Sequence, residues 1–430
     1  MLRKSFTLNI REQIKPFKKT INVDSDKSLS IRSFLIGSIS QNISETKNVL
    51  ESDDVFSAIS CLKKLGVKIK KKKKGNYLIY GKGLGSLFAK KNSNLNFGNS
   101  GTLARLLIGI LSTTPDIEIK ISGDHSLNKR NMKKLIDLMS EFGAEFKPKN
   151  KFKFPLKLIS TEMPIGINYT AGISAQLKSA VILAGLNSFG TTEINEVKAS
   201  RDHTEKMLQK NSHAIKIITS PKKIIKIFGK KYLNPTKITI PGDPSSASFF
   251  TALTILNKNS RLLIKKVGLN PTRIGFYELL KKHGAKIKFI NKRILGNEII
   301  GDIEVKSGQL KKPIIASKEF YERTTDEFPI LFCISALTNG VSIFRGIEDL
   351  ANNDSVISNQ NTVRDYVIFD YFEFDIDGLN RIVIGREYDD PSSGMTSAWC
   401  YVEKRSPQGI NNTLYLVNID DRNACLADDD

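Results

Sequence analysis

The sequence predicts an α/β protein of about six repeated units arranged in two domains. One phrase recurs: the end of an amphipathic helix, a glycine, and an alternating strand. Three copies centre on Gly66, Gly143 and Gly284, and a degraded copy has His213 in place of the glycine. Glycine suits the left-handed cap that ends many helices. The copies are 70 to 77 residues apart, and 430 residues at this spacing give about six units, which favours three in each domain.

The composition is that of a soluble globular protein, with 40% hydrophobic and 26% charged residues. The net charge of +22 suggests an anionic partner. Because the lysines are spread along the chain with few aromatic residues between them, we expect no nucleic-acid partner. The 4 cysteines and 4 histidines lack metal-ligand spacing, so we expect no metal, cofactor or disulfide. No signal peptide or membrane span is visible, and we expect a cytoplasmic monomer.

Several loops rich in small, hydroxyl or basic residues lead into helices. In the stretch from Gly98 to Arg105, backbone N–H groups at a helix start would favour a bound anion, and Thr102 is a candidate cap. Taken alone, the Gly98 turn is better explained as an ordinary turn between two structural elements. The acid pair Asp326 and Glu327 can equally serve only to complement a helix dipole. Five such helix starts and an acid pair on one architecture favour a cleft for small molecules with several anionic groups.

Seven motifs stand in the order found in one enzyme family. They are Asp26-Lys27-Ser28 with Arg32, Gly98-Asn99-Ser100-Gly101-Thr102 with Arg105, Gly123-Asp124 with Lys129-Arg130, Ser174-Ala175-Gln176, Ser200-Arg201-Asp202-His203-Thr204-Glu205, Gly242-Asp243 with Ser245-Ser246, and Asp326-Glu327-Phe328-Pro329. Over residues 6–350 the chain thereby resembles the 5-enolpyruvylshikimate-3-phosphate (EPSP) synthase family of enolpyruvyl transferases.

The resemblance implies the two-domain enolpyruvyl transferase fold of βαβαββ units, an inside-out α/β barrel. The expected domains are residues 1–24 plus 242–430 and residues 25–241. The implied reaction transfers the enolpyruvyl group of phosphoenolpyruvate to the 5-hydroxyl of shikimate 3-phosphate and releases phosphate without a metal. Related enzymes that act on UDP-N-acetylglucosamine carry a cysteine in the loop that corresponds to residues 123–132, and this chain has none there.

The resemblance also implies roles for individual residues. Those expected to bind shikimate 3-phosphate are Lys27, Ser28, Arg32, Ser174, Gln176, Arg201 and Asp326. Those expected to bind phosphoenolpyruvate are Lys27, Gly101, Arg130 and Gln176. The expected catalytic residues are Asp326, as the base at the reacting hydroxyl, and Asp354.

The resemblance stops at about residue 351. Where the family has a substrate-binding Lys, a Glu and an Arg, this chain has Asn353, Asp354 and Ile357. Residues 351–430 hold 6 Lys and Arg against 15 Asp and Glu, a net charge of −9 in a chain whose total is +22. An unrelated or frame-shifted tail explains this change better than ordinary drift. An alternative function is therefore a non-catalytic or impaired protein that binds shikimate 3-phosphate.

Overall fold

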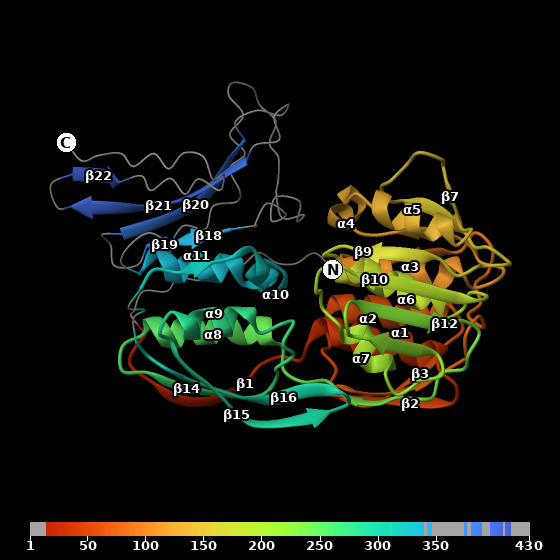
Figure 1. The fold of residues 1–430 in the computed structure, drawn as a ribbon, viewed down its shortest axis with the longest axis horizontal. Helices are drawn as coiled ribbons and strands as arrows, with labels where there is room; N and C mark the ends of the chain where they lie inside the picture. The colour runs from red at the N-terminus through yellow and green to blue at the C-terminus, as the bar shows by residue number, and fades with distance from the viewer. Residues whose placement is uncertain are drawn as a thin grey trace.

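A computed structural model describes residues 14–345, apart from 309, 311 and 339–341, together with four strand segments between residues 374 and 413. The described part consists of two α/β bodies that lie side by side (Figure 1). The first body has one hydrophobic core, which runs from Leu29 to Ile240. The second has its own, from Ala247 to Phe344, against which Phe17, Ile21 and Val23 also pack.

Four sheets share one topology. In each, the first two strands are parallel and the next two pairings are antiparallel. The first body has three of these sheets, and their strands are given in spatial order. The first sheet contains β13 (Lys237–Thr239), β2 (Ile43–Lys47), β4 (Asn76–Tyr80) and β3 (Lys68–Lys73), and the second contains β5 (Asn94–Asn96), β6 (Glu118–Ser122), β8 (Leu156–Ile159) and β7 (Glu145–Lys147). The third contains β9 (Asn168–Ala171), β10 (Thr191–Glu196), β12 (Lys223–Phe228) and β11 (Ile215–Ile218). The second body has β1 (Lys18–Asn22), β14 (Arg261–Gly268), β16 (Glu298–Lys306), β15 (Lys286–Leu295).

Three helices are enclosed within the first body: α1 (Lys27–Ile39), α3 (Gly101–Ser112) and α6 (Ala175–Gly185). Nearly every residue of each is buried, as expected of a helix that is apolar or small on all sides. Helices α3 and α6 cross where a Cβ on Gly109 would lie 2.6 Å from the carbonyl oxygen of Ala180. The body is completed by α2 (Asp53–Lys64), α4 (His125–Lys129), α5 (Lys133–Glu141) and α7 (His203–Leu208).

The second body repeats the arrangement with α8 (Pro244–Leu256) and α9 (Gly275–Lys282). Its remaining helices are η1 (Lys318–Phe320), α10 (Tyr321–Thr324), η2 (Thr325–Glu327) and α11 (Phe328–Ala336), and α11 packs on α8. The parallel pair β17 (Ile315–Ala316) and β18 (Ile343–Phe344) begins a further unit. A separate antiparallel sheet contains β19 (Phe374–Asp375), β20 (Asn380–Tyr388), β21 (Thr396–Ser406) and β22 (Gly409–Thr413).

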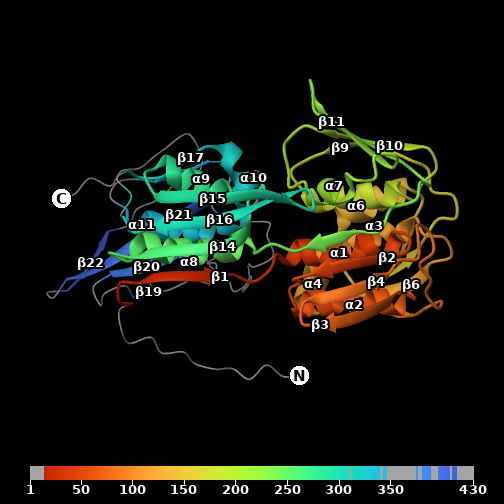
Figure 2. The same cartoon turned by 90° about the horizontal axis from the view of Figure 1, so that it is seen from below.

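Within residues 14–345 the chain crosses between the bodies twice. It leaves the sheet of the second body after β1 to enter α1, and it returns after β13 to enter α8 (Figure 2). The two crossings lie side by side, since Asp26 N donates to Pro241 O at 2.9 Å and Asp243 N donates to Asp24 O at 2.8 Å. The N-termini of α1 and α8 therefore start next to each other.

The predicted caps at the three repeat glycines are confirmed. The φ angles of Gly66, Gly143 and Gly284 are +83°, +99° and +98°, in the left-handed region. Of the six predicted units, the described residues show four sheets and the start of a fifth unit, and these sheets do not close into one barrel. No helix among the described residues is long and apolar enough to cross a membrane.

Candidate active site

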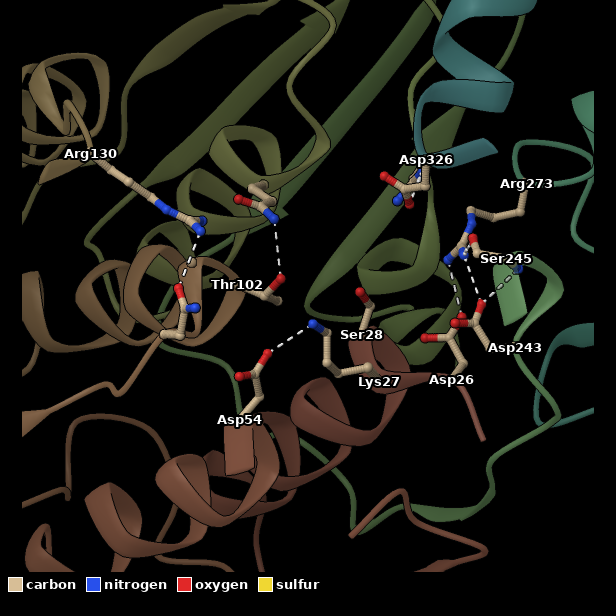
Figure 3. A pocket seen from close by; sticks show the side chains of 14 residues that line it. Asp26, Lys27, Ser28, Asp54, Thr102, Arg130, Asp243, Ser245, Arg273 and Asp326 are labelled. Carbon is tan, nitrogen blue, oxygen red and sulfur yellow. Dashed lines mark hydrogen bonds and ion pairs between the residues drawn. The ribbon is translucent and has the colours of Figure 1, made fainter. Parts of the chain in front are cut away.

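A polar pocket of about 460 Å³ lies where the two bodies meet (Figure 3). The first body supplies most of its lining, from the N-terminal ends of its helices. The lining residues are Asp26, Lys27, Ser28, Asp54, Asn99, Gly101, Thr102, Arg130, Gln176 and Arg201 from the first body, and Asp243, Ser245, Arg273 and Asp326 from the second.

The three enclosed helices of the first body begin at this pocket, and the side chain of the preceding residue caps each one. Asp26 accepts a hydrogen bond from Leu29 N at 2.8 Å, Ser100 from Leu103 N at 3.2 Å, and Ser174 from Leu177 N at 3.4 Å. The expectation that Thr102 caps α3 is wrong, since Ser100 is the cap. Thr102 lies inside the first turn, and its hydroxyl accepts a hydrogen bond from Gln176 Nε2 at 3.1 Å, which links α3 to α6.

Lys27 and Arg201 are each paired with a carboxylate of the lining. Lys27 Nζ lies 2.9 Å from Asp54 Oδ2, and Arg201 Nη2 lies 2.6 Å from Asp326 Oδ2. The Arg201 pair joins the two bodies. Although burial acts to raise the pKa of Asp326, the nearby Arg201 and Arg273 hold it below the ordinary value. Asp326 is therefore ionised at neutral pH, the state that a base requires.

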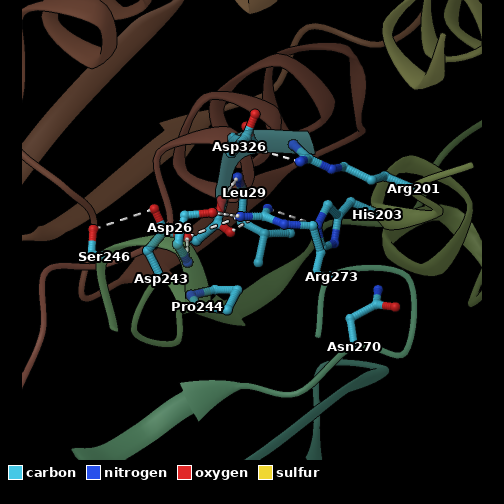
Figure 4. Close-up of polar contacts among 12 residues, drawn as sticks. Asp26, Leu29, Arg201, His203, Asp243, Pro244, Ser246, Asn270, Arg273 and Asp326 are labelled. Atoms are coloured by element: carbon cyan, nitrogen blue, oxygen red, sulfur yellow. Dashed lines mark hydrogen bonds and ion pairs between the residues drawn. The ribbon is translucent and has the colours of Figure 1, made fainter. Parts of the chain in front are cut away.

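Arg273 is buried between the bodies, with 4% of its side chain exposed. Its Nη1 lies 3.0 Å from Asp26 Oδ2, and its Nη2 lies 3.0 Å from Asp243 Oδ1 and 2.9 Å from Ser245 Oγ (Figure 4). Burial and the neighbouring Asp26 raise the pKa of Asp243. Burial also acts to raise the pKa of Asp26, but Arg273 and the smaller effects of its other neighbours together lower it. This guanidinium links the caps of α1 and α8.

Glu327 lies behind Asp326 and has a different environment. Its side chain is buried, and Ser245 Oγ donates a hydrogen bond of 2.5 Å to its Oε1. Burial raises the pKa of Glu327 to about 7. The two adjacent acids thus differ in protonation at neutral pH, with Asp326 charged and Glu327 close to half-protonated.

At the other side of the pocket, side chains from three elements surround the start of α3. Arg105 Nη1 donates to Gln176 Oε1 at 2.9 Å, and Arg130 Nη2 donates to Asn99 Oδ1 at 3.2 Å. A Cβ on Gly101 would lie 2.8 Å from Arg105 Nη1 and also 2.8 Å from Arg130 Nη1. Glycine at this position lets both guanidinium groups approach the helix start.

The structure brings most of the predicted site residues together. Those that line the pocket are Lys27, Ser28, Gly101, Arg130, Gln176, Arg201 and Asp326. Two predicted residues, Ser174 and Arg32, lie outside the lining: Ser174 caps α6, and Arg32 is buried, where its Nε donates to Thr204 Oγ1 at 2.9 Å. Asp354 lies outside the described residues.

Sequence reasoning missed two lining residues that have no distinctive motif. Asp54 looks like an ordinary acid in the first turn of a helix, and Arg273 stands alone in a loop. Asp243 was named only as part of a motif, without a role. Among the described residues, no three His, Cys, Asp or Glu side chains are grouped as a metal site.

The sequence matches, over residues 11–355, the family model described as EPSP synthase (3-phosphoshikimate 1-carboxyvinyltransferase). The chain belongs to the EPSP synthase family. The 3-phosphoshikimate 1-carboxyvinyltransferase of Novosphingobium aromaticivorans is 36% identical over 343 residues, which cover 79% of this chain and 77% of the relative. That of Hydrogenovibrio crunogenus is 37% identical over 349 residues, covering 80% and 78%.

Solved EPSP synthases share the fold. The EPSP synthase from Acinetobacter baumannii matches with a TM-score of 0.69 and 35% identity, covering 78% of this chain and 75% of that one. The predicted EPSP synthase architecture of α/β units is therefore confirmed.

Proposed function

We propose that this member of the EPSP synthase family is a 3-phosphoshikimate 1-carboxyvinyltransferase. It would transfer the enolpyruvyl group of phosphoenolpyruvate to the 5-hydroxyl of shikimate 3-phosphate and release phosphate. The observation that carries the proposal is the pocket between the bodies, which gathers seven of the predicted site residues from separate helix starts. Relatives about 36% identical over 79% of the chain bear this enzyme's name.

The two substrates would occupy different sides of the pocket. Ser28, Gln176 and Arg201 would bind shikimate 3-phosphate, next to Asp326. Gly101, Arg130 and Gln176 would bind phosphoenolpyruvate at the start of α3, where backbone N–H groups favour an anion; Gln176 would thus contact both substrates. Lys27, which stands next to Ser28 in Figure 3 with Arg130 to one side and Asp326 to the other, would contact both substrates. Arg32 and Ser174 would act by fixing α1 and α6, given their partners.

The reaction needs a base at the hydroxyl and an acid at the methylene carbon. Asp326 would take the proton of the 5-hydroxyl as its oxygen bonds to C2 of phosphoenolpyruvate, while the methylene carbon gains a proton. Loss of a proton from the resulting methyl group would then expel phosphate and restore the double bond. Lys27 and the arginines would stabilise negative charge on the tetrahedral intermediate. Asp354 stays a prediction as a second catalytic residue.

The comparisons do not support the alternative of a non-catalytic protein that binds shikimate 3-phosphate.

The domain division into residues 1–24 plus 242–430 and residues 25–241 stays a proposal, supported by two separate cores. A cytoplasmic monomer, without a membrane or nucleic-acid partner, is likewise part of the proposal.

The test is phosphate release from phosphoenolpyruvate in the presence of shikimate 3-phosphate. Asp326→Ala is expected to lower kcat by about 10²- to 10⁴-fold, because it removes the base. Lys27→Ala is expected to lower kcat/KM by about 10- to 100-fold, since a charge-assisted contact contributes roughly 1.5 to 3 kcal/mol. Asp137→Ala and Lys91→Ala, both at exposed positions, are the matched controls.

Two results would contradict the proposal. Binding of shikimate 3-phosphate without any turnover by the intact chain would restore the non-catalytic alternative. Turnover that survives both Asp326→Ala and Lys27→Ala would refute the assignment of the site.

A further inference from the structure

A buried ion cluster lies behind the wall of the pocket. The Lys178 side chain on α6 has an exposed fraction of 0%, and its Nζ lies 2.7 Å from Oε1 of Glu196 and 2.7 Å from Oε1 of Glu205. Glu196 ends β10 and Glu205 belongs to α7. One ammonium group thus joins three elements that meet behind the substrate-binding residues.

The two carboxylates stand at the two ends of the loop that carries Arg201. This loop, residues 197–202, connects β10 to α7. Glu196 Oε1 also accepts hydrogen bonds from Ser200 N and Ser200 Oγ, both at 2.9 Å. Lys178 therefore orients the carboxylate of Glu196, which holds Ser200, the residue immediately before Arg201. Through Glu205, Lys178 also fixes α7, which follows the loop.

A second set of contacts extends this anchor to α1. Thr204 Oγ1 donates to Ser179 Oγ at 2.8 Å, and Arg32 Nε donates to Thr204 Oγ1 at 2.9 Å. Arg32 Nη1 also donates to Ser28 O at 3.1 Å. Three pocket-lining residues, Ser28, Gln176 and Arg201, thus lie within four residues of members of this network.

The charges in the cluster are mutually dependent. Although burial acts to lower the pKa of Lys178, Glu205 and Glu196 raise it above the ordinary value. Burial acts to raise the pKa of Glu196, but Lys178 and Lys223 together lower it to about 2. An apolar residue of similar volume could fill the same space and pack well. It could not hold the two carboxylates, so the directional contacts to Ser200 and α7 would be lost.

We propose that Lys178 is a positioning residue: through Glu196 and Glu205 it fixes loop 197–202 and so presents Arg201 to the pocket. This inference rests on the proposed function for its kinetic readout. Lys178 touches no substrate in this scheme, and its removal affects the reaction only through the placement of Arg201.

The kinetic test compares three variants. Lys178→Met is expected to raise KM for shikimate 3-phosphate at least tenfold while kcat falls by less than that factor, because Arg201 binds substrate and Asp326 stays in place. Lys178→Arg retains the charge and is expected to restore part of the loss. Lys223→Met is the matched control: Lys223 Nζ contacts the other oxygen of Glu196 at 2.5 Å but is 27% exposed, and a change within twofold is expected.

A second variant and a structural readout cover the case in which Lys178→Met does not fold. Thr204→Val keeps the side-chain shape but removes the hydroxyl between Arg32 and Ser179, and it too is expected to raise KM for shikimate 3-phosphate. Amide hydrogen exchange in residues 197–202 is expected to accelerate in every variant with raised KM and to stay unchanged in Lys223→Met.

The proposal is overturned if folded Lys178→Met or Thr204→Val loses thermal stability while KM for shikimate 3-phosphate stays within twofold. It is also overturned if Lys223→Met raises KM as much as Lys178→Met. Absence of turnover in the unchanged chain would refute the proposed function instead. The role of Lys178 in fixing loop 197–202 could still be tested then, because amide hydrogen exchange in Lys178→Met does not depend on turnover.

Discussion

Asp326 and Glu327 are neighbours in the sequence and have opposite electrostatic surroundings. Asp326 faces Arg201 across the pocket, whereas Glu327 is buried behind it against Ser245. The pKa of Asp326 is lowered and that of Glu327 is raised to about 7. The difference comes from placement within one turn of chain, and at neutral pH it separates a charged residue in the pocket from a half-protonated one in the core.

Glu327 makes the stability of the protein dependent on pH. Its pKa in the folded chain, about 7, exceeds the ordinary 4.5, so the folded state binds this proton more tightly. The resulting stabilisation is fully present below pH 4.5 and is lost as the pH rises through 7. Glu327→Gln is expected to remove up to about 3 kcal/mol of this pH dependence in the free energy of unfolding, measured with urea at pH 5 and pH 8.

The control for this variant is Glu162→Gln, at an exposed position, which is expected to change the unfolding free energy by less than about 0.5 kcal/mol at either pH. If Glu327→Gln retains the full pH dependence of the unchanged chain, another group is responsible for it.

The residue types at the pocket were predictable from sequence, but several of their partners were not. Lys27, Gly101 and Arg201 stand in motifs at helix starts, where local chemistry indicates an anion site. Asp54 and Arg273 acquire their roles only when distant segments meet. Sequence spacing contains no information on such contacts.

At the scale of elements, two glycines of α3 have distinct functions. Gly101 lies at the pocket, where a Cβ would meet the flexible ends of Arg105 and Arg130. Gly109 lies at the crossing with α6, where a Cβ would meet the backbone of Ala180 at 2.6 to 3.1 Å. The same substitution should therefore affect ligand binding at one position and folding at the other.

Gly101→Ala is expected to raise KM for phosphoenolpyruvate about tenfold or more with little loss of stability, since the guanidinium groups can move away. Gly109→Ala is expected to lower the free energy of unfolding by about 1 to 3 kcal/mol, because α3 and α6 must separate. Steady-state kinetics and urea unfolding of both variants check this, and each serves as the control for the other. Equal effects of the two variants on KM would refute the distinction.

Several of the lysines that make the chain basic lie on edge strands. Strand β3 is the edge of its sheet and is mostly lysine with exposed side chains, and the edge strand β15 carries Lys286, Lys288 and Lys292. Lysine on an edge strand opposes pairing with another chain. This accounts for part of the net charge without a nucleic-acid partner.

Helix ends were more predictable than sheet partners. The left-handed glycines after α2, α5 and α9 follow from a local sequence pattern. The pairing of β1 with β14 and of β13 with β2 joins segments about 200 residues apart or more. No local pattern indicates that β1 joins the second body or that β13 joins the sheet of β2 in the first body.

At the scale of the whole molecule, Arg273 is the main buried ionic link between the N-termini of α1 and α8. Its removal would leave the buried Asp26 and the partly buried Asp243 as neighbouring carboxylates without their cation. Arg273→Leu is therefore expected to lower the free energy of unfolding by about 3 to 5 kcal/mol, as measured by urea unfolding.

Arg261 offers a matched control, since it pairs with Glu304 and its side chain is 47% exposed. Arg261→Leu is expected to cost at most about 1 kcal/mol. Equal losses for the two arginine variants would show that the position between the bodies has no special importance.

The pairs Lys27 with Asp54 and Arg201 with Asp326 have a further consequence for selectivity. Each cation already has an anionic ligand from the protein, so an incoming anion must compete with a tethered carboxylate. A simple ion such as sulfate exchanges one such contact for another and gains little. A molecule with several anionic groups can displace both carboxylates in a single binding event, so we expect the pocket to discriminate among ligands by their number of anionic groups.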